Sequence, residues 1–149
     1  MKIMVSACLL GRNCKYNGGN NYSAALAELL KGHTVVEVCP EVLAGFPTPR
    51  PRIERRSGRV INEHGQDVHE ACLAGVRRAV DLARTEGVEL LILQSRSPSC
   101  GVNEIYDGTF SGVRIPGQGL FAEELIKAGF RVMDVEDVGN VKCKGQNAK

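Results

Sequence analysis

Four short apolar runs recur along the chain, and each predicts a β-strand. The run at Glu89–Leu93 is almost continuously apolar, which is typical of a strand in a parallel sheet that is covered on both faces. The others are equally short and rich in β-branched residues. In full, the predicted strands cover Lys2–Ala7, Thr34–Val38, Glu89–Leu93 and Phe130–Val135.

Three helices are predicted between these strands. They cover Ala24–Lys31, Val68–Glu86 and Leu120–Ala128. Ser23 and Asp67 stand where an N-cap side chain is expected, and Gly32 and Gly87 stand where a helix stops. In the longest helix, the small and apolar residues recur at helical spacing and predict one buried face.

The alternation of strands and helices indicates an α/β fold. We expect a Rossmann-like, open, mainly parallel sheet with helices on both faces, formed by a single domain at 1–138 with a polar tail at 139–149. Two connections, Cys39–Gln66 and Ser95–Gly117, show no strand or helix period, and we expect them to be long irregular loops. Loops of that length inside a compact domain are usually functional.

Composition narrows the function classes. The chain has 149 residues and a net charge of +2, which argues against nucleic acid as a partner. No apolar run approaches the roughly 18 residues of a membrane helix, and the first residues lack the apolar region of a signal peptide. We expect a cytoplasmic protein without a membrane partner. The arginines within Arg50–Arg59 are expected to form a solvated basic loop.

Three of the six cysteines follow predicted strands. Cys8, Cys39 and Cys100 come directly after a strand or a few residues beyond it. Because parallel strands place their carboxyl ends at one edge of a sheet, the three thiols should face one crevice. Clustered thiols in a cytoplasmic chain favour metal binding over disulfides. Three thiolates without a histidine favour an iron–sulfur or zinc centre that keeps one coordination position open.

The remaining cysteines are less informative. Cys14 lies in the Gly- and Asn-rich loop after Cys8, where it can supply a fourth ligand or pack the loop onto the core; packing is the simpler interpretation. Cys72 lies on the apolar face of the longest helix and is expected in the core. Cys143 lies in the polar tail and is expected to be exposed.

Polar residues beside these cysteines are candidates for chemistry. Glu41 follows Cys39 by two residues, where its carboxylate could act as a general base for water next to a metal. Ser97 and Ser99 precede Cys100, and their hydroxyls could bind substrate, contact a cluster or cap a turn. The sequence pattern does not rank these roles.

Two other classes of protein share these features. One is a non-catalytic metal- or nucleotide-binding module that uses the same three-cysteine crevice, for example with zinc and Cys14 as the fourth ligand. The other is a redox protein in which Cys8 and Cys14 form a reversible disulfide.

Four motifs in this order resemble the 2-thiouracil desulfidase family, which are iron–sulfur-dependent desulfidases. They are Cys-Leu-Leu-Gly-x-x-Cys-Lys-Tyr-x-Gly, Cys-Pro-Glu with Pro-Thr-Pro-Arg, Ser-Pro-Ser-Cys-Gly, and Tyr-Asp-Gly-Thr-Phe-Ser-Gly. These motifs occupy Cys8–Gly18, Cys39–Glu41, Pro47–Arg50, Ser97–Gly101 and Tyr106–Gly112. The resemblance spans roughly residues 1–138.

The resemblance implies a 4Fe–4S cluster bound by Cys8, Cys39 and Cys100, with one iron left open for the sulfur of the substrate. It implies a non-redox desulfuration, 2-thiouracil to uracil plus sulfide, or the same reaction on a similar small thioamide. Glu41 would transfer protons, and Ser97 would position substrate or water. A free thiolated base is expected rather than a transfer RNA, since relatives that act on thiolated RNA carry a second domain.

Two positions depart from what the family pattern leads us to expect. Gln94 stands where a basic residue is expected, and Asn17 where an acidic one is expected. Both changes would alter substrate choice without removing a ligand.

Overall fold

Four parallel strands form the central sheet of the computed structural model, which describes residues 1–138. The strand order is β2-β1-β5-β8, so β1 and β5 are central. All three pairings are parallel, and Val5 in β1 is in register with both Glu37 and Ile92. The bounds are β1 Lys2–Ser6, β2 Thr34–Val38, β5 Leu90–Leu93 and β8 Val132–Asp134. The α/β class and the parallel sheet expected from the apolar runs are confirmed.

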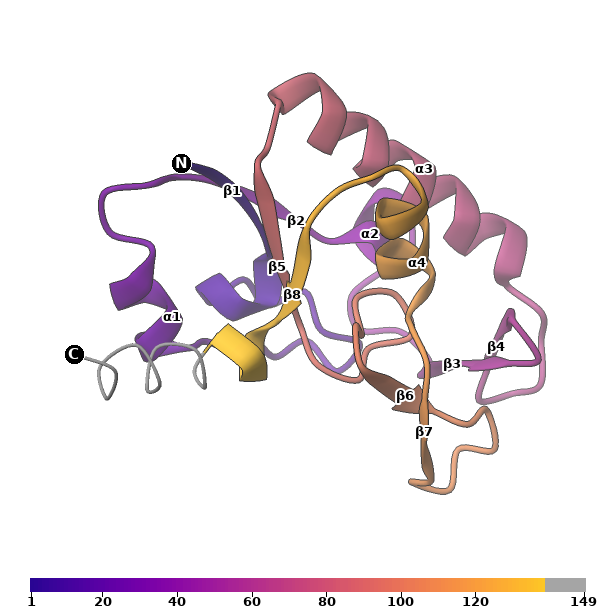
Figure 1. Cartoon of the computed structure of the whole chain (residues 1–149). Coiled ribbons are helices and arrows are strands. Elements are labelled where there is room, and N and C mark those ends of the chain that lie inside the picture. The colour runs from indigo at the N-terminus through magenta and orange to yellow at the C-terminus, as the bar shows by residue number, and fades with distance from the viewer. Residues whose placement is uncertain (139–149) are drawn as a thin grey trace.

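Helices cover both faces of this sheet (Figure 1). On one face, Met4, Leu91 and Leu93 pack against the helices α3 and α4 in the larger buried cluster. On the other face, the shorter helix α1 covers Ile3 and Val5 in a second cluster. The helices are α1 Ala24–Leu29, α2 Pro40–Leu43, α3 His69–Glu86 and α4 Leu120–Lys127, with a 3-10 turn at Ala7–Leu10.

The predicted helix ends are confirmed at Ser23 and Gly87, whereas α1 ends at Leu29, two residues earlier than predicted, with Leu30 rather than Gly32 at its C-cap. The Ser23 hydroxyl accepts a hydrogen bond from the Leu26 N–H, as an N-cap does, and Gly87 ends α3 in a left-handed conformation. The expectation that Asp67 caps the longest helix was wrong. Val68 occupies the N-cap position and makes no side-chain capping bond. The Asp67 carboxylate instead accepts a hydrogen bond from the N–H of His69, the first residue of α3.

The expectation of two irregular connections was also wrong. The first contains α2 and the antiparallel pair β3 Ile53–Arg56 and β4 Arg59–Asn62, and the second contains the pair β6 Glu104–Tyr106 and β7 Arg114–Pro116. These strands have only three or four residues, which is too short for an apolar alternation to reveal them. Polar contacts hold the hairpins together: Glu54 accepts from the N–H groups of Gly108 and Phe110.

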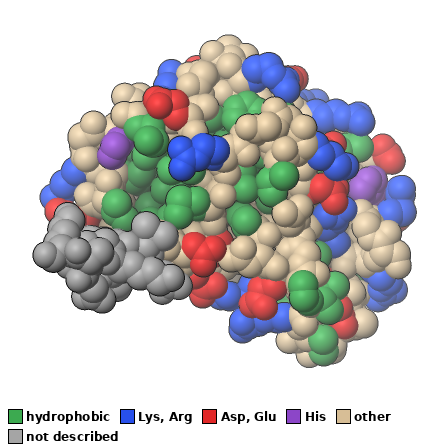
Figure 2. Space-filling model, in the orientation of Figure 1, with side chains coloured by type: hydrophobic (Ala, Val, Ile, Leu, Met, Phe, Trp, Pro, Cys, Tyr) green, Lys and Arg blue, Asp and Glu red, His purple; other side chains and the backbone are tan. Residues whose placement is uncertain are grey.

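Both hairpins lie beyond the carboxyl ends of the sheet strands, at the lower right of Figure 1. Ile53 and Glu54 of β3 and Tyr106 of β6 line the crevice at that edge. On the face drawn in Figure 2, the described Lys, Arg, Asp and Glu side chains are interspersed rather than sorted by sign. Among the described residues, no helix is long and apolar enough to cross a membrane. The predicted tail and Cys143 lie outside the described residues.

Candidate metal centre and active site

A cavity of about 440 Å³ opens at the carboxyl edge of the sheet, between the strand ends and the two hairpins. Four cysteines from separate segments line it, namely Cys8, Cys14, Cys39 and Cys100. This volume lies within the range of small-molecule sites. The structure thus brings together the three cysteines that the strand pattern selected, and adds Cys14.

Each cysteine is positioned by a different local structure. Cys8 lies in the 3-10 turn that follows β1, and Cys39 is the residue from which α2 begins. Cys100 follows β5 at the end of a tight turn, in which the Ser97 hydroxyl accepts from the N–H groups of Ser99 and Cys100. The three positions meet because β1, β2 and β5 are neighbours in a parallel sheet.

Glycines allow the turn that carries Cys100 to approach α4. A Cβ atom on Gly119 would lie 2.4 Å from the carbonyl carbon and oxygen of Ser99, a distance that no real side chain tolerates. A Cβ atom on Gly101 would lie 2.8 Å from the Ser97 oxygen. The Gly119 N–H donates to the Gly101 carbonyl at 2.8 Å. Only glycine at Gly119 lets the helix begin directly against the cysteine turn.

The thiols differ in how readily they ionise. The hydrogen bond from Cys14 lowers the pKa of Cys8 below its usual value, and outweighs burial, which raises it. The Asn21 amide also donates to the Cys8 sulfur, at 3.7 Å. The hydrogen bond with Cys14 raises the pKa of Cys39 well above its usual value, and burial adds to the rise. Burial raises the pKa of Cys100 to about 12, although hydrogen bonds from Ser6 and Ser97 oppose the shift.

Cys14 lies between the thiols of Cys8 and Cys39. The bond with Cys39 lowers the pKa of Cys14, while the bond with Cys8 and burial raise it, and the net shift is upward. Cys14 packs partly against the apolar cluster on the α1 face and also lines the cavity. Both roles weighed from the sequence, packing and ligation, are compatible with this position.

The donor set can be tested against the two kinds of metal centre. Within residues 1–138, no group of three or more His, Cys, Asp or Glu side chains surrounds a point at which one metal ion could bind. A zinc site requires at least three protein donors around a single ion, which the described residues do not provide in this arrangement. An iron–sulfur cluster instead distributes its cysteine ligands over separate iron atoms. Separate thiols at one end of a cavity fit such a cluster.

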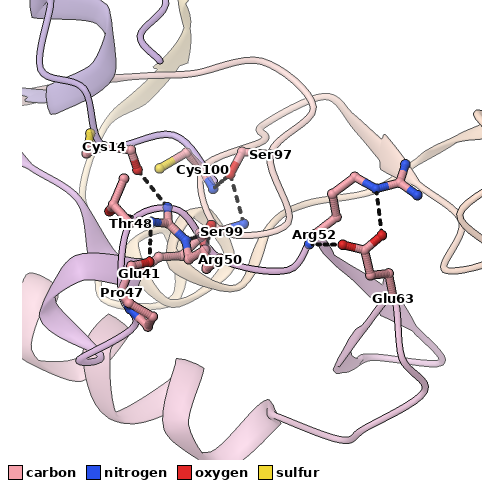
Figure 3. A network of polar contacts seen from close by, with 10 residues as sticks. All are labelled: Cys14, Glu41, Pro47, Thr48, Arg50, Arg52, Glu63, Ser97, Ser99 and Cys100. Atoms are coloured by element: carbon pink, nitrogen blue, oxygen red, sulfur yellow. Dashed lines mark hydrogen bonds and ion pairs between the residues drawn. The ribbon is translucent and has the colours of Figure 1, made fainter. Parts of the chain in front are cut away.

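Glu41 follows Cys39 by two residues, and it lines the same cavity. Its Oε1 atom accepts from Arg50 Nε at 3.0 Å, and its Oε2 atom accepts from the Ser99 hydroxyl at 3.1 Å. The side chains of Arg50 and Glu41 are 5% and 13% exposed. The carboxylate therefore has a fixed orientation at the cavity wall (Figure 3).

The expectation of a solvated basic loop was wrong for two of its arginines. Arg50 is buried beside Glu41, and Arg55 is buried where its guanidinium donates to the carbonyl groups of Gln118 and Gly58. Arg59 remains half exposed in a pair with Asp67. Arginine can be buried in such places because its five donors meet several oxygen acceptors at once.

Sequence reasoning did not separate the two serines, and the structure does. The Ser97 hydroxyl is occupied by the turn that places Cys100, whereas the Ser99 hydroxyl contacts Glu41. The role of Arg50 was also missed, although Arg50 belongs to the Pro-Thr-Pro-Arg motif. A charged residue at the end of a proline-rich motif was the one signal that pointed to it.

The two departures from the family pattern lie in different places. Gln94 lines the cavity, and its backbone N–H donates to the Ser6 hydroxyl at 3.0 Å. Asn17 does not line the cavity; its side chain accepts from the Gly19 N–H in a surface turn. Only Gln94 is therefore placed to contact a ligand directly.

Comparison with known proteins finds similar sequences and a similar structure. The family model described as 2-thiouracil desulfurase matches residues 3–137. The chain is 36% identical to a protein of Bacillus subtilis (strain 168) named uncharacterized protein YbbK, across 93% of this chain and 99% of that one. It is similar in structure to the [4Fe-4S]-dependent thiouracil desulfidase TudS, with a TM-score of 0.86 and 36% identity over 97% of each chain.

Proposed function

The chain belongs to the 2-thiouracil desulfurase family, and we propose that it hydrolyses the carbon–sulfur bond of a thiolated pyrimidine or a similar small thioamide. The ligands of its iron–sulfur cluster would be Cys8, Cys39 and Cys100. One observation carries the proposal: the three thiols from three strand ends share a cavity with a buried, oriented carboxylate. The cavity volume suits a free base rather than a polymer.

The reaction we propose needs no electron transfer. Water supplies the oxygen that replaces sulfur on the ring carbon, and the sulfur leaves with the two protons of that water, so thioamide plus water gives amide plus hydrogen sulfide. When bound, the cluster supplies an open iron that acts as a Lewis acid towards the leaving sulfur, a soft donor.

The residues of this chain would manage the protons and the position of the base. Glu41, whose carboxylate borders the cavity, would accept a proton from the attacking water and pass it to the departing sulfur. Ser99 would hold one oxygen of that carboxylate in place. Ser97 would shape the turn that presents Cys100, and its side chain, which lines the cavity, would position substrate or water.

The direct test uses protein that is reconstituted with iron and sulfide under anaerobic conditions. We expect sulfide and uracil to appear in equal amounts from 2-thiouracil. Glu41→Gln should retain the cluster and lose about a hundredfold or more in kcat, the usual contribution of a general acid–base group. Asp67→Asn is the matched control, because Asp67 also pairs with an arginine but lies on the surface.

Protein with a full cluster that releases no sulfide from thiolated bases would refute the proposed function. Stoichiometric zinc in protein as isolated, with Cys14 required for its retention, would favour the non-catalytic binding module instead.

A further inference from the structure

The Arg50 side chain is only 5% exposed at the wall of the cavity, and its guanidinium contacts several separate segments (Figure 3). Nε donates to Glu41 at 3.0 Å, and Nη2 donates to the Cys14 carbonyl at 2.7 Å. Nη1 donates to the Thr48 hydroxyl at 3.0 Å and to the Pro47 carbonyl at 3.3 Å. The Arg50 backbone N–H also donates to the Tyr16 carbonyl at 2.8 Å.

These contacts connect two segments that lie beyond the ends of neighbouring strands. Cys14 and Tyr16 belong to the loop after β1, whereas Glu41 belongs to α2, which follows β2. The loop carries a cysteine of the cavity, and α2 carries the carboxylate. Arg50 is bonded to both, so it fixes the distance between the cysteine loop and the carboxylate.

The helix α2 is too short to orient Glu41 unaided. It has four residues, and it is anchored at Gly75 of α3, where a Cβ atom would lie 2.3 Å from the Pro40 carbonyl oxygen. That contact fixes the backbone, but it leaves the Glu41 side chain several rotamers. The bonds from Arg50 and Ser99, one to each carboxylate oxygen, select one of them.

A lysine would not replace this arginine. The guanidinium directs its N–H groups along fixed, coplanar directions, and here those directions meet a carboxylate, a hydroxyl and two carbonyl oxygens. An ammonium is a point charge with three donors and a flexible stem. A lysine ammonium would keep a positive charge beside Glu41, but it could not bond to all four acceptors of the guanidinium at once.

We propose that Arg50 is a positioning residue that fixes the Glu41 carboxylate relative to the cysteine loop, so that Glu41 faces the carbon–sulfur bond of the substrate. This inference rests on the proposed function for its catalytic consequence. Arg50 acts through Glu41 and through the Cys14 loop, and it does not itself contact the reacting atoms.

The test is a double-mutant cycle in the cluster-loaded protein. Arg50→Lys should lower kcat about tenfold or more, with KM changed less than about threefold and iron content unchanged, since the loss affects the transition state rather than substrate binding. In a Glu41→Gln background, Arg50→Lys should change kcat less than about twofold. Arg59→Lys should leave turnover unchanged, because its partner Asp67 is on the surface.

A second measurement does not depend on activity. In cluster-free protein, the urea midpoints of Arg50→Lys, Glu41→Gln and the double variant should show a combined loss clearly smaller than the sum of the single losses. The matched cycle of Arg59→Lys and Asp67→Asn should be additive, since exposed pairs couple weakly. The urea cycle keeps the inference testable even where the loaded protein releases no sulfide, which refutes the proposed function alone.

Several results would overturn the inference. The first is normal turnover in Arg50→Lys. The second is a loss of kcat in the Glu41→Gln background as large as in the parent background, and the third is additive urea midpoints for the Arg50 and Glu41 variants. A variant that loses iron but keeps normal turnover per cluster would also overturn it, because Arg50 would then serve the cysteine loop alone.

Discussion

The two buried regions of this protein are built in opposite ways. Between the sheet and the helices α3 and α4, the fully buried side chains are apolar, with Met4, Leu91, Phe121 and Leu125 among them. At the carboxyl edge and in the hairpin β3–β4, polar side chains are buried beside the apolar ones. These polar residues are Ser6, Glu54, Arg55, Asn62, Ser95, Ser99 and Asp134.

The difference shows what each region contributes. Apolar burial stabilises the fold in proportion to area and requires no particular orientation. Buried polar groups contribute little net stability, but they are costly to leave unpaired, so they fix geometry. In the described residues, every fully buried side-chain N or O atom has a hydrogen-bond partner. We conclude that the core supplies stability and the carboxyl edge supplies a defined site.

The largest difference between the two regions should appear in thiol reactivity, measured on one cysteine of the core and one of the cavity. Burial raises the pKa of Cys72 to about 12, whereas the pKa of Cys8 lies below its usual value. At pH 8 the thiolate fraction of Cys8 should therefore far exceed that of Cys72, and thiolates are the reactive form. Iodoacetamide should label Cys8 long before Cys72 in cluster-free protein, and labelling of Cys8 should slow as the pH is lowered.

Mass spectrometry of digested protein gives the two labelling rates. Both cysteines should react alike in concentrated urea, which is the control. Equal rates in the folded protein would mean that Cys72 is not part of a closed core.

A core truncation should lower stability without altering the site. Leu125→Ala removes a fully buried side chain from α4 and should lower the free energy of unfolding by about 2–5 kcal/mol. Turnover per bound cluster should stay unchanged, because Leu125 does not line the cavity. Urea denaturation and iron-normalised kinetics measure the two quantities, with the exposed Leu29→Ala as the control. A large loss of turnover in Leu125→Ala would mean that the two regions are not separable.

A methyl group added at Gly119, where α4 meets the turn that carries Cys100, should affect both stability and iron binding. Gly119→Ala would place a Cβ atom 2.4 Å from Ser99, so either α4 or the turn that carries Cys100 must move. We expect a loss of about 1–3 kcal/mol in stability, as for an overpacked core, together with reduced iron binding. In Gly19→Ala the nearest atom is a movable Asn17 side-chain oxygen, so that control should retain iron. Full iron content in Gly119→Ala would show that the turn tolerates displacement.

The smallest effect is expected at Gln94, which lines the cavity without a strong side-chain bond. Its amide donates only a 3.4 Å contact to the Ser95 carbonyl. Gln94→Lys restores the basic residue that the family pattern leads us to expect, and should change KM for 2-thiouracil by about two- to tenfold with kcat little affected. The free energy of unfolding should change by less than about 0.5 kcal/mol. A KM identical to that of the parent protein would remove Gln94 from substrate recognition.

Much of this architecture was predictable from the sequence, and the exceptions share one cause. The four apolar runs identified the sheet, and because strand ends converge they also identified Cys8, Cys39 and Cys100 as neighbours. The hairpins were missed because Glu54 and Arg55, rather than an apolar alternation, hold them to the rest of the chain. Arg50 was taken for a surface residue for the same reason, since its acceptors come from segments distant in the sequence.

The central claim is that Cys8, Cys39 and Cys100 hold a 4Fe–4S cluster at the carboxyl edge of the sheet. Iron and acid-labile sulfide, measured per chain after anaerobic reconstitution, test it most directly. We expect about four of each in the parent protein and in Cys72→Ala, and a large loss in each of Cys8→Ala, Cys39→Ala and Cys100→Ala. Full iron and sulfide content in any of those three variants would contradict it.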